Sequence, residues 1–384
     1  MFRAALFLVL TLFTAALRAQ APPAGTWLSK DGKKFVAELV AADGLRATFA
    51  PPDKPKFVIP LTDLDPADAD NIRSWRATYF RTPLIEPSLI PKWPAQAVAD
   101  KIEVKSMGEE GGVYRFESPN FELISDLRLP ISAVRDIATV LEATRAVLIA
   151  IPLGLHAGGE QEKYPVLLYG TAAGYAAAGG PEGSGGYYDA RARHMLVLLP
   201  NLGIEQKGGT IRLNYGSNYF VLKHEVTHQL LARWHGHIPM WLSEGIAEFI
   251  ASIPYSGGRY NLQKPGAGLR DYILKWRKAK DDNGITLIPS KELMELEERD
   301  WRRAMAQSSA YDLYNSSALL TWYFIQEDNG TRFAAYLDGL RRGRDDESLL
   351  LRGRKLEVVD QDVAAMAKKM GLTQKKPDIV AGQK

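Results

Sequence analysis

The sequence predicts an α+β protein, in which a short β-rich segment precedes a larger mixed unit that becomes mainly helical. Between residues 25 and 62, short runs of alternating apolar and polar residues are separated by Asp43-Gly44 and by PPDKP, which is typical of β-hairpins. Further strand-like runs, YPVLLYG and HMLVLLP, follow in the larger unit. After them, apolar residues recur at helical spacing, and Asn329-Gly330 marks the end of one such helix.

Residues 1–21 have the pattern of a cleaved secretory signal. Arg3 gives a basic start, an apolar run extends from Ala4 to Leu17, and small residues follow. A retained membrane anchor is the alternative, but a bilayer span needs ~20 apolar residues and this run is shorter. We therefore expect an exported protein, periplasmic or extracellular, with no stable membrane insertion after the signal is removed.

Composition restricts the chemistry that the chain can perform. Its 384 residues are 46% hydrophobic and 24% charged, as in an ordinary globular protein. The formal net charge is only +3, so we expect neither nucleic acid nor anionic lipid as a partner. The chain contains no cysteine, which excludes disulfides and thiol chemistry. Any metal ligands must therefore be His, Asp or Glu.

Residues 25–76 are expected to form a small all-β unit with a terminal helix. In DPADADNIRSWRA, Asp65 is the expected N-cap, Pro66 takes the first helical position and Asp68 lies in the first turn. The motifs W-x-x-x-D-G-K-x-F-x-A-E and V-I-P-L-x-D-L resemble the SLA-type homology domain. This resemblance implies an SH3-like barrel that either binds another protein or packs on the larger domain. A β-rich cap on that domain is the alternative.

The rest of the chain is expected to divide into three parts. A Pro-rich connector covers residues 77–110, the main domain covers residues 111–370, and a poorly ordered polar tail covers residues 371–384. The glycine-dense segment 171–193 has no phosphate-binding motif and is expected to be a mobile loop. Helices are predicted over residues 131–151, 218–234, 267–280, 290–304 and 311–326.

The predicted helix 218–234, NYFVLKHEVTHQLLARW, carries the motif H-E-x-x-H. Residues four apart share one face of a helix, so His224 and His228 can direct two imidazoles at one ion. Glu225 is rotated by about 100° from His224 and can reach a water on that ion. A polar patch on a helix is the alternative, because a bare H-E-x-x-H match is not specific.

A catalytic zinc needs a third protein ligand and an open fourth position. In PMWLSEGIAEF, a second helix starting at Pro239 would carry Glu244, and the turn HGHIP would return this carboxylate to the ion. Glu248 lies one turn further along the same face, where it can accept the second N–H of a ligand histidine. An exposed carboxylate on a helix is the alternative for Glu248.

H-E-x-x-H followed by W-L-x-E-G-x-A-E resembles the gluzincin metallopeptidases, the clan of thermolysin and the zinc aminopeptidases. The metzincin pattern would require Gly and His at the positions of Leu231 and Trp234, and is excluded. The gluzincin resemblance implies a thermolysin-like catalytic domain with one Zn2+ ion and Glu225 as general base. The zinc ligands that it implies are His224, His228 and Glu244.

The resemblance also implies two features of the cleft. A strand at 194–200 would border it and hold an extended peptide by backbone pairing; an ordinary core strand is the alternative. A phenol would donate to the developing oxyanion, with Tyr314 as first candidate and Tyr311 as second. Ser317 stands where the family has glycine, and a buried aromatic on a core helix is the alternative for Tyr314.

We therefore expect a zinc-dependent peptidase that acts on a peptide or protein substrate. The G-x-M-E-N signature of zinc aminopeptidases is absent, which argues against removal of single residues from a free amino terminus. A purely structural zinc site is disfavoured, because a closed site has no use for a base at position 225. The alternative from another class is a catalytically inactive binding or scaffold protein that keeps the peptidase fold.

Overall fold

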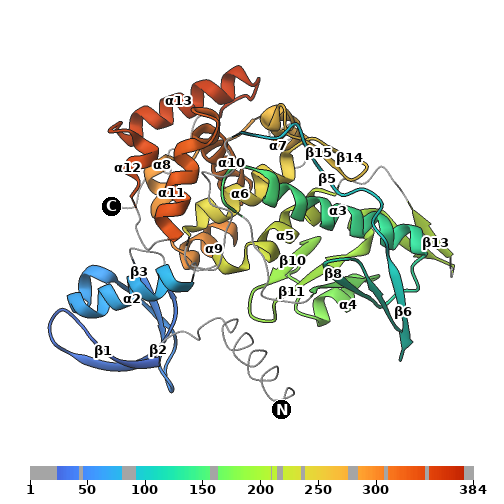
Figure 1. The fold of residues 1–384 in the computed structure, drawn as a ribbon, viewed down its shortest axis with the longest axis horizontal. Coiled ribbons are helices and arrows are strands. Elements are labelled where there is room, and N and C mark those ends of the chain that lie inside the picture. The colour runs from blue at the N-terminus through green and yellow to red at the C-terminus, as the bar shows by residue number, and fades with distance from the viewer. Residues whose placement is uncertain are drawn as a thin grey trace, which may run out of the picture. The chain divides into compact units, whose positions relative to one another are not determined.

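The computed structural model has a mixed α+β fold, as predicted (Figure 1). The chain divides into two compact units, residues 1–83 with 339–345, and residues 84–338 with 346–384. The predicted signal segment 1–21 lies outside the described residues. The structure describes residues 24–42, 46–79, 92–155, 163–208, 210–213, 219–234, 238–275, 284–306, 310–341 and 346–375.

The first unit contains a four-stranded antiparallel sheet in the order β1-β2-β3-β4. Apolar and polar residues alternate along these strands, so that Trp27, Leu39 and Phe49 are buried in one core. The rings of Trp27 and Phe49 meet edge to face, with their centres 5.1 Å apart. Within the described residues β1 and β4 are the two edges, so the sheet is open and the SH3-like barrel is not confirmed. The strands are β1 Ala24–Leu28, β2 Lys34–Ala42, β3 Arg46–Ala50 and β4 Phe57–Pro60.

Helix α2, Pro66–Tyr79, begins at the predicted cap. The Asp65 carboxylate accepts a hydrogen bond from Ala67 N at 2.9 Å, which satisfies a backbone donor of the first turn. The Asp68 carboxylate accepts from Leu28 N at 2.6 Å and ties this turn to the end of β1. Asp65 therefore fixes the start of the helix, and Asp68 fixes its position on the sheet.

The second unit is built on a six-stranded mixed sheet in the order β10-β11-β9-β8-β7-β6. The central strands β8, β9 and β11 are parallel neighbours, and the remaining pairs are antiparallel. Helix α3, Ile131–Ala150, connects β8 to β9, because parallel strands require a long crossover. The strands are β6 Lys105–Glu110, β7 Val113–Glu117, β8 Phe121–Ser125, β9 Tyr164–Tyr169, β10 Gly186–Asp189 and β11 His194–Leu198.

Two segments contain more regular structure than predicted. The range 77–110, expected as a connector, contains β5, Gln96–Val98, and the whole of β6. The glycine-dense segment 171–193, expected as a mobile loop, contains α4, Ala172–Ala177, and β10. The Thr171 side chain accepts from Gly174 N and caps α4, a local signal that the surrounding glycines hide in the sequence.

The strand predicted at 194–200 does not border an open edge. It forms β11, which pairs with β10 on one side and with β9 on the other. Its main-chain groups are therefore used within the sheet, so the expectation that it pairs with a peptide is wrong. The edge on this side of the sheet is β10.

The helical part differs from the predicted ranges at several ends. The described part of the predicted range 218–234 contains α5 followed by a short 3-10 helix, Ala232–Trp234. The predicted range 290–304 is divided between α8 and α9 at Leu296, whose backbone is extended. The helices are α5 Phe220–Leu230, α6 Met240–Ser252, α7 Leu269–Lys275, α8 Ser290–Glu295, α9 Glu298–Ala306, α10 Ala310–Gln326, α11 Thr331–Arg341, α12 Ser348–Leu351 and α13 Leu356–Lys369.

The start of the predicted tail, 371–384, is paired with the rest of the second unit. Ile285 N donates to the Thr373 carbonyl, and Lys375 N donates to the Ile285 carbonyl, both at 2.9 Å. The tail beyond Lys375 lies outside the described residues. Across the helices that the structure describes, none combines the length and apolar character needed to cross a bilayer.

Candidate metal centre

Helix α5 lies in the interior of the second unit and is covered on most of its surface. It contacts α3 and α6 as well as strands β10 and β11. From Leu222 to Leu230 only Glu225 is not buried. The Gln229 side-chain amide donates to the Pro165 carbonyl at 2.8 Å, which fixes the helix to β9. The two histidines therefore project from a rigid, buried helix.

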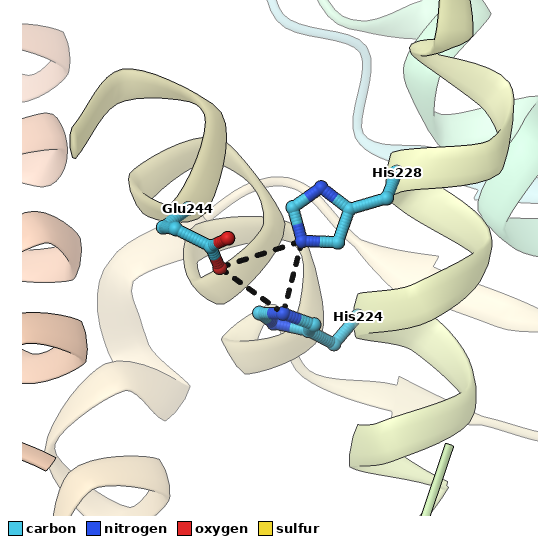
Figure 2. A group of neighbouring side chains, drawn as sticks. All are labelled: His224, His228 and Glu244. Carbon is cyan, nitrogen blue, oxygen red and sulfur yellow. Dashed lines mark hydrogen bonds and ion pairs between the residues drawn. The ribbon is translucent and has the colours of Figure 1, made fainter. Parts of the chain in front are cut away.

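Helix α6 returns along α5 and carries the third predicted ligand. Its first turn follows Pro239, which has extended backbone, and Ser243 N closes that turn on the Pro239 carbonyl at 3.0 Å. Figure 2 shows Glu244 on this helix facing His224 and His228 on α5. Both imidazoles are buried, and the Glu244 side chain is 12% exposed.

The three ligand atoms have the spacing that a metal ion requires. The two Nε2 atoms lie 3.1 Å apart, and Glu244 Oε2 lies 3.4 Å from each of them. Ligands at ~2.0–2.1 Å from a tetrahedral ion are separated by about 3.3 Å, so one ion fits between these atoms. His224, His228 and Glu244 therefore form a group that could hold a metal ion. Two nitrogens and one carboxylate oxygen suit zinc among other metals.

Glu248 lies directly behind the first histidine. Its carboxylate is fully buried rather than exposed, and its Oε1 lies 3.0 Å from His224 Nδ1. A carboxylate in this position would keep a proton on Nδ1 and leave the Nε2 lone pair for a metal ion. Glu248 thus lies near the His224 ring, as its position one turn beyond Glu244 predicts, and its role toward that ring stays a prediction.

The charges of the group depend on one another. Burial lowers the pKa of His224, but the adjacent carboxylates of Glu244 and Glu248 outweigh burial and raise that pKa to about 10. Burial raises the pKa of Glu244, whereas the two adjacent histidines hold it well below its usual range. A metal ion that binds to Nε2 of His224 must displace any proton that this nitrogen carries.

The other two candidate residues lie beside this group. Glu225 is partly exposed, and its Oε2 accepts a hydrogen bond from Tyr188 N on β10 at 3.0 Å. Tyr314 on α10 packs edge to face against the ring of His224 at 5.9 Å, and Trp301 on α9 packs against Tyr314 at 6.1 Å. Tyr311, the second phenol considered, is partly buried in the first turn of α10.

A close contact between α6 and α10 was not visible in the sequence. A Cβ added to Gly245 would lie 2.1 Å from Thr321 Oγ1 and 2.7 Å from the Ser317 carbonyl oxygen. No side chain fits there, so glycine lets the helix that carries Glu244 approach the helix that carries Tyr314. The glycine is part of the W-L-x-E-G motif, but only the packing explains it.

Gly245→Ala is expected to destabilise the protein by about 1–3 kcal/mol, because the new methyl group must push α10 away from α6. The free energy of unfolding in urea measures this change. Gly25→Ala is the control, since nothing lies within 4 Å of the added methyl group there. An equal unfolding midpoint for Gly245→Ala and the wild type would show that the two helices separate without cost.

Lys223, immediately before the first histidine, is a second feature that sequence patterns did not indicate. It is buried, with its Nζ 4.9 Å from the ring centre of Phe220 and 5.5 Å from that of Tyr260. The Ile253 carbonyl oxygen lies 3.4 Å from Nζ. Burial lowers the pKa of this lysine from its ordinary value of 10.5 to about 7.

Lys223→Met is expected to stabilise the protein at pH 7, because the folded state resists protonation of this lysine and the unfolded chain does not. As the pH falls from 10.5 to about 7, the cost to the wild type grows by about 1.4 kcal/mol per pH unit. Urea unfolding at pH 7 and pH 10 should show an advantage for Lys223→Met that shrinks at the higher pH. Exposed Lys275→Met is the control, and a pH-independent advantage for Lys223→Met would contradict the argument.

Comparisons with known proteins give no identification: no family model, no curated protein and no solved structure matches the chain.

Proposed function

We propose that the protein is a zinc-dependent peptidase of the gluzincin type. The observation that carries this proposal is the meeting of His224, His228 and Glu244 at the spacing of metal ligands. A second carboxylate, Glu225, lies next to the first ligand on the same helix and is partly exposed. Three ligands with a partly exposed carboxylate beside them suit a catalytic ion better than a structural one.

The chemistry follows from the positions of the side chains. Zinc, when bound, acts as a Lewis acid that polarises a carbonyl group and makes a water more acidic. Glu225 would take a proton from the attacking water and transfer it to the amine that leaves when the peptide C–N bond breaks. Tyr314 would donate a hydrogen bond to the carbonyl oxygen as it gains negative charge. Glu248 would hold the His224 ring in place through Nδ1.

The substrate that suits this arrangement is an extended peptide or protein segment. Strand β10 is the sheet edge in contact with α5; Glu225 takes its Tyr188 N–H, and the main-chain groups of Gly186, which face the same edge, would pair with a substrate segment in β conformation. The near-neutral chain gives no support for a nucleic-acid substrate. The signal-like start favours export, so the expected substrates are periplasmic or extracellular.

Metal analysis and peptide digestion test this proposal together. Purified protein is expected to contain one zinc ion, to cleave members of a peptide library, and to lose this activity to a chelator and recover it with zinc. Zinc without cleavage would favour the scaffold alternative. Protein that takes up no metal would exclude the proposed function and leave the histidine pair as a polar cluster of the interior.

A further inference from the structure

Strand β10 has one set of main-chain groups that its sheet does not use. Its pairing with β11 includes a hydrogen bond from Leu198 N to the Gly185 carbonyl at 3.0 Å. In an antiparallel pair, bonded and non-bonded positions alternate along each strand. The peptide groups of Tyr187 therefore also face β11, while those of Gly186 and Tyr188 face the open edge.

At this edge Tyr188 N–H donates to Glu225 Oε2 at 3.0 Å. The Tyr188 side chain is itself buried, so this residue is held by its packing as well as by the hydrogen bond of its N–H. A sheet edge and the carboxylate next to the first metal ligand are thus joined by one hydrogen bond. The bond engages one of the two carboxylate oxygens of Glu225.

Gly186 is what allows β10 to come this near to α5. A Cβ added to Gly186 would lie 2.6 Å from Val221 Cγ1 and 3.0 Å from Glu225 Cγ. The backbone of Gly186 is not in the left-handed region, so its conformation does not require glycine. The requirement is the close approach of the strand to the helix.

We propose that β10 positions the general base: Tyr188 N–H, brought to α5 by the absence of a side chain at Gly186, holds one oxygen of Glu225 and leaves the other for the attacking water. This inference rests on the proposed peptidase function. A carboxylate fixed through one oxygen loses little orientational freedom when it reacts, which raises the rate of proton transfer. Gly186 and the Tyr188 peptide group are therefore positioning residues that act through Glu225.

Amide hydrogen exchange on the metal-free protein tests the contact without reference to catalysis. In Glu225→Ala, protection of the Tyr188 amide is expected to fall about tenfold or more, because this edge amide loses its acceptor. The Leu198 amide, which donates within the sheet, is the internal control and should keep its protection. Equal protection of the Tyr188 amide in both proteins would overturn the proposal.

Two variants at one position test the role in catalysis. Tyr188→Pro lacks the N–H and is tolerated at an edge position whose N–H points away from the sheet. Tyr188→Ala loses the same phenol ring but keeps the N–H. With equal zinc content, kcat of Tyr188→Pro is expected to be about tenfold or more below that of Tyr188→Ala. Equal kcat values would overturn the positioning role.

A double-mutant cycle covers the case in which Tyr188→Pro does not fold. Gly186→Ala should lower kcat in the wild type and have no further effect in Glu225→Gln, because it acts through that carboxylate. Gly185→Ala, whose methyl group would meet only the side chain of Asn201 among its nearest neighbours, is the matched control. Additive losses from Gly186→Ala and Glu225→Gln would overturn the inference.

A zinc-loaded wild type that cleaves no peptide would instead refute the proposed function. Hydrogen exchange would still decide whether Tyr188 N–H and Glu225 are in contact.

Discussion

Replacing Glu225 with glutamine is expected to leave zinc bound and to lower kcat for peptide hydrolysis by about 100- to 10,000-fold. Glutamine has nearly the same shape and can still accept the Tyr188 N–H, so the local structure should remain. The amide cannot take a proton from water, however, and the base is lost. Steady-state kinetics on a peptide identified by digestion, with zinc content measured on the same samples, checks this result.

The matched control for Glu225→Gln is Glu122→Gln. Glu122 lies on β8 and pairs with Arg115 at 3.0 Å, so its replacement makes the same chemical change at a site that forms a surface ion pair. Its kcat should equal that of the wild type. Full activity in Glu225→Gln would remove this residue from the mechanism, whereas loss of zinc in that variant would make it a determinant of metal binding.

Glu244→Ala is expected to weaken zinc binding more than any other single carboxylate change in the site, because it removes one of the three proposed ligands. Glu248→Ala should weaken binding by about 10–100-fold, since the carboxylate behind a ligand histidine orients the ring without touching the ion. Competition with a chromophoric chelator measures both dissociation constants. The expected order of affinity is wild type, then Glu248→Ala, then Glu244→Ala.

Glu292→Ala, an exposed carboxylate in the first turn of α8, is the control for these two variants and should bind zinc like the wild type. Wild-type affinity in Glu244→Ala would show that this residue is not a ligand. A larger loss in Glu248→Ala than in Glu244→Ala would mean that the buried carboxylate, and not the one facing both imidazoles, dominates the site.

The grouping of the three candidate metal ligands could be predicted because its geometry is mostly local. Helical spacing alone places His224 and His228 on one face, and the chain between His228 and Glu244 is just long enough for a turn and a returning helix. The structure brings these three residues together as a possible metal site, while the identity of the metal stays a prediction. Glu248 follows from the same helical spacing.

The remaining features depend on contacts between distant segments. The alternation of apolar and polar residues predicts the strands of the first unit. Closure of a barrel depends instead on whether the first and last strands pair, and here β1 and β4 are the opposite edges of the sheet. Nothing in the glycine-dense segment indicates that Gly186 lies against α5, and nothing around the single Gly245 indicates that it lies against α10. From the sequence alone, Lys223 would be expected to lie exposed on a helix. The structure shows that this helix is buried on most sides and that Lys223 is buried with it.

The two outer strands of the six-stranded sheet are protected very differently from self-association. All of β6 is exposed, it carries Lys105, Glu109 and Glu110, and its register shifts between Ser106 and Gly108. Charges and a bulge discourage a neighbouring molecule from adding a strand there. β10 has its edge occupied at Tyr188 by a carboxylate of its own chain. Concentrated protein should therefore resist the addition of a full strand from a neighbouring molecule at both ends of the sheet, by charge at one and by an internal hydrogen bond at the other.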